Sequence, residues 1–519
     1  MDSQKAQLKR DPSRRHLMDF LFALSLANLN LLMIWRFLLY ASQPDRFLLP
    51  DYGAVDYLSA LLLLTGLTLA VWAMVHLLRR LRNSLVQRLC GGFFLAVALY
   101  HPIENIRMTL GIGAGEMFGP FRELAAMRIP AAVFLISIFL IRYQLPGKAA
   151  FFAVVIFFPF AISNLLQCGW RLLVPADPRT AASLSAGIEQ PLTRKAADSG
   201  TKRPRVVWIV FDELDYRVTF PERPSSIDLR SFDRLRSESF FATNVLEPGV
   251  STVVSISALM LGKGVAETKP VGETVLMVKL EGTEKDLRFE EQENFFYEAR
   301  QMALRSAIIG FHLPYCRLFA GSYDACYRVI GYPAERNWRS FPVVFAAHAR
   351  KLIPLHSRSE FVDGVKRGIR LSRKLVADEN LDLVYIHLPI PHPPFVYDHE
   401  RGRFSIFSFG NSGYFDNLVL ADQVLGEIRS AMEEAGIWEK TTLFVTADHG
   451  WRMSDFYDGK RDHRIPFILR LAGQREALTW DRPFDVLASK DLLLAIMEGR
   501  IRDPWEVGAW LQRVEEGGR

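Results

Sequence analysis

Long apolar segments recur through roughly the first 170 residues, and they constrain the fold more than any other feature of the chain. Crossing the hydrocarbon core of a bilayer takes about 20 apolar residues. The first segment is too long for a cleaved signal peptide. We therefore predict about five transmembrane helices within residues 1–171, near Phe20–Leu39, Leu58–Leu78, Leu89–Leu110, Pro130–Ile141 and Ala149–Trp170.

The predicted spans differ in how well they fit a transmembrane helix. Leu89–Leu110 fits less well, because the charged residues Glu104 and Arg107 lie in its second half. Pro130–Ile141 is short for a span. Leu58–Leu78 contains no Asp, Glu, Lys or Arg. A buried helical bundle in a soluble protein is the alternative interpretation, but successive segments of spanning length argue against it.

The distribution of charge orients the predicted spans. Residues 1–16 and 79–88 are rich in Lys and Arg, whereas the loops at 45–56 and 111–123 are not. Basic loops remain in the cytoplasm. With an odd number of spans, everything after Arg171 lies outside. We expect a multi-pass protein of the bacterial inner (plasma) membrane with an extracytoplasmic second half.

Composition limits the kinds of partner. The formal net charge of +6 is spread along 519 residues without a dense basic run among aromatics, so we do not expect nucleic acid as a partner. The four cysteines form no CxxC pair, which argues against a cysteine zinc cluster. Cys316 and Cys326 could form a disulfide in an oxidising compartment.

The second half has the pattern of an α/β domain. Residues 172–203 carry no periodic apolar pattern and are interpreted as a linker before a domain at 204–519. Strand-like runs alternate there with helical segments such as 228–240, 247–263 and 418–435, which favours a mostly parallel sheet covered on both faces. The predicted strands are Arg205–Phe211, Arg305–Gly310, Leu383–Leu388, Thr441–Ala447 and Pro466–Leu471.

Polar side chains follow several of these strands. Asp212-Glu213 and Asp448-His449 each come directly after a predicted strand. Ligands of open α/β sheets collect at the carboxyl ends of the strands, and acids with an imidazole suit a metal ion. Thr252 would lie at a helix N-terminus, which favours an anion. Taken singly, an acid pair is more often a turn or cap, and Thr252 a helix cap.

The order of these pieces resembles the sulfatase-like branch of the alkaline phosphatase superfamily, over about Arg205 to Leu471. IVFDE is similar to its first metal-binding strand, and GVSTVVSISALMLGK to the nucleophile segment of membrane phosphoethanolamine transferases and lipoteichoic acid synthases. HLPIPHPPF, TTLFVTADHG and DHRIPFILR resemble three later segments. The resemblance implies an alkaline-phosphatase-like α/β/α domain.

The resemblance also implies a site. It assigns Thr252 as the nucleophile, and His392 and His463 to phosphate binding or to the leaving group. His392, which lies between prolines, could instead mark only a rigid turn. One divalent ion (Zn, Mn, Mg or Ca) would be bound by Asp212, Glu213, Thr252, Asp448 and His449. The role of Asp212 stays open, because sulfatases have an acid at both positions of this pair and transferases often do not.

The implied activity is transfer of phosphoethanolamine or phosphoglycerol from a membrane phospholipid to an envelope glycan or lipid, through a phospho-threonine intermediate. Ser251-Thr-Val-Val-Ser lacks the Pro or Ala and the Arg of the motif that sulfatases oxidise to formylglycine. A sulfatase-like phosphodiesterase or sulfuric ester hydrolase is the alternative activity. A non-catalytic envelope protein is a third, which the intact Thr, Glu, Asp and His set disfavours.

Overall fold

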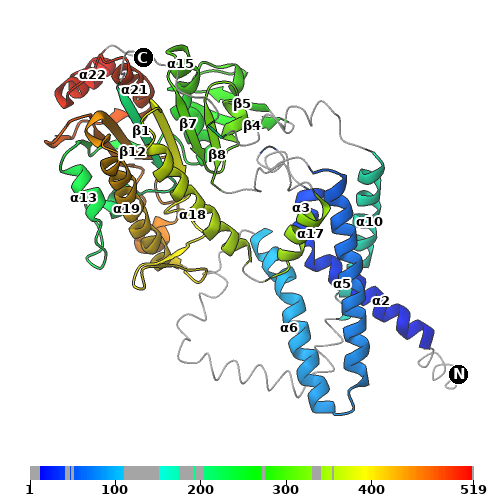
Figure 1. The fold of residues 1–519 in the computed structure, drawn as a ribbon. Helices are drawn as coiled ribbons and strands as arrows, with labels where there is room; N and C mark the ends of the chain where they lie inside the picture. Colours follow the sequence, from blue (N-terminus) through cyan, green and yellow to red (C-terminus); the bar gives the residue numbers. More distant parts are fainter. Residues whose placement is uncertain are drawn as a thin grey trace. The chain divides into compact units, whose positions relative to one another are not determined.

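The computed structural model describes residues 12–40, 47, 52–109, 151–152, 154–174, 191–192, 204–271, 275–329, 340–353, 356–408 and 410–516 (Figure 1). The chain divides into two compact units, which interleave along the sequence. The helical unit comprises Met1–Ser42, Tyr52–Asp177 and Glu335–Ser357. The sheet unit comprises Gln43–Asp51, Pro178–Ala334 and Arg358–Arg519.

The helical unit is held together by apolar side chains. Leu31, Trp35, Leu64 and Cys168 belong to one buried cluster within it. Pairs of its helices pack along much of their length, most extensively α2 with α5. Its described helices are α2 (Pro12–Asn30), α3 (Leu32–Leu38), α5 (Ala54–Arg80), α6 (Ser84–Thr109), α10 (Phe158–Leu173) and α17 (Phe341–Arg350).

Fewer helices than predicted are suited to crossing a membrane. Among the described residues, Ala54–Arg80 and Val154–Leu173 are long and apolar enough. A third span exists if Arg15–Asn30 and Leu32–Leu38, which are bent by 63° at a break, count as one. The structure therefore supports two or three spans in the part of the chain that it describes, rather than five.

The two remaining predicted spans account for the difference. Leu89–Leu110 falls largely within α6, which carries polar residues and Pro102 and does not reach the apolar character of a span. Pro130–Ile141 lies outside the described residues. Most of the predicted linker, 172–203, lies outside them too.

The sheet unit contains an eight-stranded sheet in the order β14-β2-β13-β12-β1-β9-β7-β8. Only β13 runs antiparallel to its neighbours, which confirms the predicted mostly parallel α/β sheet. The strands are β1 (Arg205–Phe211), β2 (Phe240–Ala242), β7 (Ser306–Gly310), β8 (Ala325–Arg328), β9 (Leu383–Leu388), β12 (Thr441–Ala447), β13 (Phe467–Arg470) and β14 (Leu478–Trp480).

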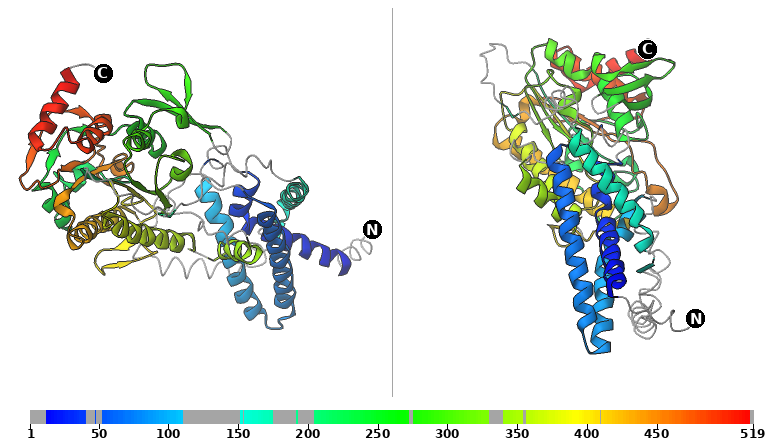
Figure 2. Two further views of the ribbon diagram at one scale, coloured as in Figure 1. Left: turned by 45° about the horizontal axis from the view of Figure 1, so that its top comes forward. Right: turned by 90° about the vertical axis from the view of Figure 1, so that its right-hand side faces the viewer.

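Helices cover both faces of this sheet. Figure 2 shows α18 (His356–Val376) and α19 (Gly410–Glu434) on one side and α21 (Ser489–Met497) on the other. On the α21 side, α14 (Thr252–Leu261) and α15 (Phe295–Gln301) pack with α21. The central strands are wholly buried because almost every residue in them is apolar, as sheets covered on both faces require.

Three further features complete the sheet unit. A small antiparallel sheet of β4 (Val265–Val271), β5 (Val275–Leu280) and β6 (Asp286–Arg288) follows α14. Cys316 and Cys326 form a disulfide. Phe47, from the segment between α3 and α5, is completely buried in the main core, and the Arg317 guanidinium lies 4.9 Å from its ring centroid.

Candidate active site

The pairing of β1 with its neighbours gathers polar side chains at one edge of the sheet. Phe211 pairs with Ala447, so Asp212 and Asp448, the next residue of each strand, are neighbours. On the other side of β1, Val210 pairs with His387 in β9. Side chains two residues apart on a strand share a face. Asp212, His387 and Asp448 therefore point to the same face of the sheet.

These three side chains form a compact buried group. One ligand atom from each of Asp212, His387 and Asp448 lies within 4.8 Å of the others. His449 Nε2 lies 3.3 Å from Asp448 Oδ2 and 3.9 Å from Asp212 Oδ1. Carboxylates and imidazoles at such separations, shielded from water, could hold a metal ion.

The hydrogen bonds of this group show that a cation fits it. Both carboxylate oxygens of Asp212, one of Asp448 and Nε2 of His387 are buried without a hydrogen-bond partner in the described structure. His449 Nδ1 lies 3.0 Å from the Gly450 carbonyl and donates to it, so Nε2 presents its lone pair to the carboxylates. Acceptors that face only one another are costly when buried. A divalent ion between them removes that cost.

The acidities of the group point the same way. Burial, and then the nearby Asp448 and Glu213 carboxylates, raise the pKa of Asp212 well above its usual value. Burial also raises the pKa of Asp448, but the neighbouring His449 and His387, together with hydrogen bonds from Thr252 and the Glu213 backbone, leave this pKa below its usual value. Burial lowers the pKa of His387 to about 4, so this imidazole is neutral at pH 7, as a metal ligand must be.

Thr252 is the first residue of α14, and Ser251 is its N-cap in extended conformation. The Thr252 hydroxyl lies 3.4 Å from His449 Nε2, and the residue is only 7% exposed. Unpaired backbone N–H groups and the positive end of the helix dipole surround this position. An anion bound at this end of α14 would therefore meet the hydroxyl.

Glu213, a predicted ligand, shares its carboxylate with an arginine. Its backbone is in the left-handed region, with φ 65°. Glu213 Oε1 accepts a hydrogen bond from Arg452 Nε at 2.6 Å, while Oε2 is buried without a partner. Arg452 Nη2 lies 3.1 Å from His392 Nε2, and 42% of the Arg452 side chain is exposed. A guanidinium thus connects Glu213 with the predicted substrate histidine.

An acid connects His463, the second predicted substrate histidine, to Gly450, just after β12. His463 Nδ1 lies 2.6 Å from Glu247 Oε1. Glu247 Oε2 accepts the backbone N–H of Gly450 at 2.8 Å. The His463 side chain is 55% exposed, so its ring reaches solvent beside the buried group.

The structure therefore brings Asp212, Thr252, Asp448 and His449 together, with Glu213 next to them. Sequence reasoning missed His387, Arg452 and Glu247. A signal existed for His387, since one imidazole in the otherwise apolar run of β9 must find a polar partner. Tyr315 supplies it, with its hydroxyl 2.8 Å from His387 Nδ1. Arg452 and Glu247 gave no comparable signal.

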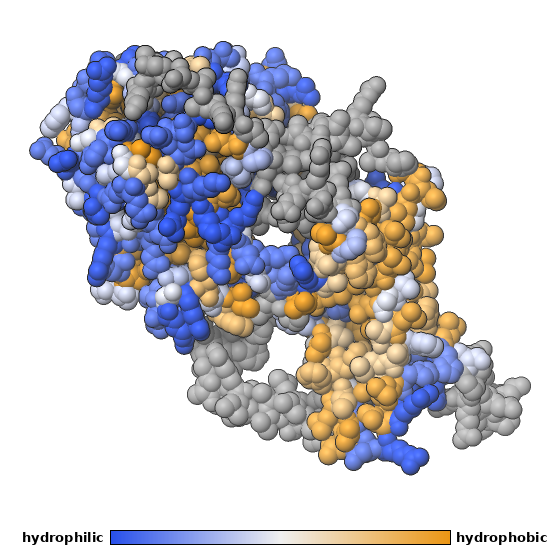
Figure 3. Space-filling view, viewed as in Figure 1, coloured by the Kyte–Doolittle hydropathy of each residue, from blue (hydrophilic) through white to orange (hydrophobic). Residues whose placement is uncertain are grey.

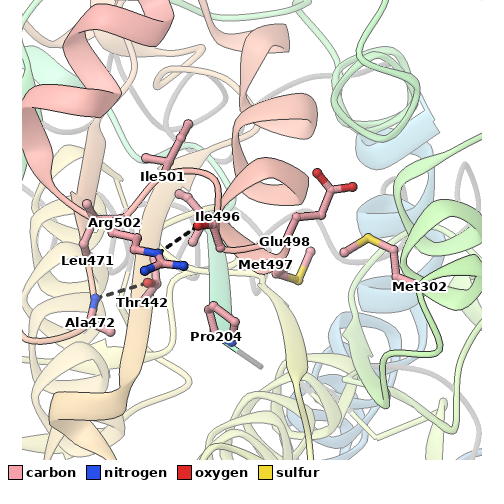
Figure 4. Close-up of a pocket in the computed structure, with 11 residues that line it drawn as sticks. Pro204, Met302, Thr442, Leu471, Ala472, Ile496, Met497, Glu498, Ile501 and Arg502 are labelled. Atoms are coloured by element: carbon pink, nitrogen blue, oxygen red, sulfur yellow. Dashed lines mark hydrogen bonds between the residues drawn. The ribbon is translucent and has the colours of Figure 1, made fainter. Parts of the chain in front are cut away.

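A cavity of about 730 Å³ lies elsewhere in the sheet unit (Figure 4). Pro204, Thr442 and Leu471 line it, next to the start of β1, the start of β12 and the end of β13. It therefore opens at the opposite edge of the sheet and contains none of the site residues.

Comparison with known proteins places the sheet unit in a family. A model of the family described as Sulfatase matches residues 204–493, which is more than half of the chain. No curated protein matches the sequence.

Solved structures resemble the chain only distantly. The PsFucS1 sulfatase from Pseudoalteromonas sp. is 15% identical with a TM-score of 0.40, covering 62% of this chain and 72% of that one. The lipoteichoic acid synthase LtaP from Listeria monocytogenes is 11% identical (TM-score 0.39; 60% and 76% covered). A protein of the alkaline phosphatase superfamily from Vibrio parahaemolyticus is 14% identical (TM-score 0.38; 60% and 69% covered).

The extent of the family match decides the assignment, and the mostly parallel sheet with acids and imidazoles at its carboxyl edge agrees with it. The chain belongs to the sulfatase family and is an enzyme of the alkaline phosphatase superfamily.

Proposed function

We propose that this enzyme transfers a phospho-alcohol group, phosphoethanolamine or phosphoglycerol, from a membrane phospholipid to an envelope glycan or lipid. The observation that carries the proposal is the position of Thr252, whose hydroxyl meets a buried group of acids and imidazoles at the start of a helix. A threonine hydroxyl there serves as a nucleophile toward phosphorus.

Asp212, His387, Asp448, His449 and Thr252 would hold one divalent ion, with Glu213 beside them. Bound there, Zn²⁺, Mn²⁺, Mg²⁺ or Ca²⁺ would act as a Lewis acid that lowers the pKa of the Thr252 hydroxyl and attracts a phosphoryl oxygen. The buried carboxylates keep the nucleophile oriented, and α14 directs its N-terminal N–H groups at the phosphate.

In the first half-reaction, Thr252 Oγ loses its proton to water and bonds to phosphorus, and the bond from phosphorus to the diacylglycerol oxygen breaks. We assign His463, oriented by Glu247, to protonate that departing oxygen. In the second half-reaction, the hydroxyl of the acceptor bonds to phosphorus and returns its proton to His463. The bond from phosphorus to Thr252 Oγ breaks, and Thr252 Oγ takes back a proton from water.

Arg452 and His392 are assigned to the phosphate oxygens. The guanidinium is already anchored by Glu213, so it offers its outer N–H groups to an anion with little loss of side-chain freedom. His392 lies within 3.1 Å of the same guanidinium and adds a second nitrogen to this surface. Removing either should raise KM and lower kcat together.

A lipid donor is supported by the helical unit, in which two or three described helices could span a membrane. We place the protein in the bacterial inner (plasma) membrane as a multi-pass protein with an extracytoplasmic sheet unit. The basic residues of 79–88 and the Cys316–Cys326 disulfide support this orientation.

Mass spectrometry of the purified protein after incubation with total lipid tests the proposal. We expect Thr252 to gain the mass of a phospho-alcohol group, which is lost again when an acceptor is added. Ser251→Ala serves as the matched control and should still be modified. An unmodified Thr252 under conditions of turnover would exclude the covalent route.

A sulfatase-like phosphodiesterase or sulfuric ester hydrolase is the second candidate. Asp212 favours it, because the resemblance gives sulfatases acids at both positions of this pair and Asp212 lies inside the buried group. In a hydrolase, water rather than an acceptor would clear the adduct. Loss of the adduct in buffer alone, at the rate of turnover, would select the hydrolase.

A further inference from the structure

The helix α17 belongs to the helical unit, although it follows the first four strands of the main sheet in sequence. Its sequence, FPVVFAAHAR, has no acidic residue and no basic residue before its last turn. Val344 and His348 are buried, while Phe345, Ala349 and Leu352 join the apolar cluster of α5. One face of this short helix is thus fully used for packing.

The exposed side chains at the start of α17 and just past its end are apolar as well. Val343 is 45% exposed, and Ile353, just past the helix, is 56% exposed. Phe341 is 36% exposed, with its ring beside that of Phe345. Arg350, in the last turn, is the one charged residue among these exposed positions. Isolated exposed apolar residues are common, but three within thirteen residues favour an apolar environment.

The location of α17 indicates which environment this is. It packs on the half of α5 that begins at Ala54, since Tyr57, Ala60 and Leu64 share its cluster. His348 Nε2 lies 4.0 Å from Asp56 Oδ1 at the same end. Arg79 and Arg80 mark the other end of α5. Because basic residues mark the cytoplasmic end of a span, α17 lies at the outer end.

The helix α5, on which α17 packs, also exposes apolar side chains. Leu58 and Leu62 of α5 are 44% and 47% exposed. Figure 3 shows apolar residues gathered over the visible face of the helical unit and polar ones at the end that carries the α5–α6 loop. The C-terminal end of α17 adds the exposed Arg350, whose charge complements lipid phosphates, whereas Lys351 Nζ lies 5.5 Å from the centroid of the Phe37 ring.

We propose that α17 lies in the outer interface of the membrane. Phe341, Val343 and Ile353 contact the upper acyl chains there, and Arg350 reaches the lipid phosphates. Interfacial helices of this kind enter about 5–10 Å below the headgroups. A bilayer fits better than a second copy of the chain, because α5, on which α17 packs, also exposes apolar side chains and α17 ends in a cation. This inference rests on the membrane orientation proposed above, but not on the reaction assigned to the enzyme.

Depth-dependent quenching in the full-length protein tests the proposal. Single cysteines, labelled with an environment-sensitive dye, are introduced in a Cys90→Ser background, because Cys168 is buried and Cys316 is paired with Cys326. The protein is placed in vesicles of phosphatidylglycerol and phosphatidylethanolamine with a lipid-borne nitroxide. Val343→Cys is compared with Val271→Cys in β4, a valine of 47% exposure, and with Leu62→Cys in α5, at 47%.

We expect a nitroxide near the headgroup to quench the Val343→Cys label at least about half as strongly as the Leu62→Cys label, and the Val271→Cys label little. Aqueous iodide should give the reverse order. Quenching at Val343→Cys no greater than at Val271→Cys would overturn the proposal. Disulfide-linked dimers of unlabelled Val343→Cys, without lipid quenching, would overturn it in favour of contact between two copies.

Discussion

The two ends of β1 contain buried charges that are treated in opposite ways. At its start, Arg205 is 7% exposed, and its guanidinium donates to the carbonyls of Leu381 and Val376 at 2.9 and 2.8 Å and to Thr441 Oγ1 at 3.0 Å. Directly after its end, Asp212 is 1% exposed, and neither carboxylate oxygen has a hydrogen-bond partner in the described structure.

This difference separates a structural charge from a functional one. The Arg205 guanidinium exchanges its water for carbonyl groups that would otherwise be buried unpaired, so it stabilises the fold on its own. The buried Asp212 carboxylate lacks hydrogen-bond donors, so its burial destabilises the fold until a ligand binds. Buried acids with perturbed pKa values are concentrated at functional sites. Substitutions at the start of β1 should therefore affect stability, and those after its end should affect chemistry.

The largest effect is expected for Thr252→Ala, at the functional end. The variant should fold and insert without losing a helix cap, because Ser251 rather than Thr252 is the N-cap residue of α14. Its turnover should fall at least ~10³-fold, because the nucleophile is missing. Assays of transfer from a lipid donor check this, with Ser251→Ala as the mild control. Near-normal transfer by Thr252→Ala would show that Thr252 is not the nucleophile.

Arg205→Met should have the next largest effect, on stability alone. It leaves several buried carbonyl groups without a donor, so we expect a loss of about 3–5 kcal/mol in the free energy of unfolding. Denaturant unfolding in detergent measures it, with Arg475→Met, an 81% exposed side chain, as the control at under about 0.5 kcal/mol. Activity per folded molecule should be unchanged, and a selective loss of activity would refute a purely structural role.

Removing the metal ion should lower the stability of the protein, because the buried carboxylates after β1 then have no partner. Chelation should lower the melting temperature, because free metal at about 100–1,000 times its dissociation constant contributes about 3–4 kcal/mol. Asp448→Asn should be largely insensitive to the same chelator, since it has lost a ligand. An equal shift in both proteins would locate the bound metal elsewhere.

The smallest effect is expected at Asp215, which caps α12 (Tyr216–Thr219) just beyond β1. Burial, only partly offset by its hydrogen bond from Val218, raises the pKa of Asp215 to about 6. An acid with a raised folded-state pKa stabilises the fold below about pH 4 and loses that contribution as the pH rises through about 6.

In Asp215→Asn, the side-chain oxygen can still accept the capping hydrogen bond from Val218, but the side chain no longer ionises. The wild type should therefore lose about 2 kcal/mol relative to this variant between pH 4 and 7. Melting temperatures of the two proteins across that range measure the difference. Parallel curves would show that Asp215 titrates normally, and the unpaired oxygen it presents would then need another explanation.

The strands of the site could be predicted because their sequences leave no choice. Arg205–Phe211 and Leu383–Leu388 were predicted with the bounds the structure gives, since uninterrupted β-branched and aromatic runs ending in polar residues fit only a buried strand. The Asp448-His449 pair was equally visible. Which of Asp212 and Glu213 enters the buried group depends on strand register and on Arg452, and neither could be seen beforehand.

Other features depended on tertiary context. The residues of α17 satisfy the pattern of an ordinary core helix, and only the packing of Phe345 and Leu352 shows that they join α5. The break at Leu31 divides an apolar run that reads as one straight span. Leu89–Leu110 reads as a span by length but not by composition. Within the described residues, apolar length alone therefore overestimated the number of spans.

The exchange of segments between the units has a consequence for how this protein can be produced. A truncation that begins near residue 204 would retain α17 without α5. The apolar side chains of α17 that pack on α5 would then be exposed to water. The same truncation would discard Phe47 and leave a hole in the core beside Arg317. Expression of a catalytic fragment should therefore improve when residues 335–357 are replaced by a short polar linker and the 43–51 peptide is fused or supplied separately.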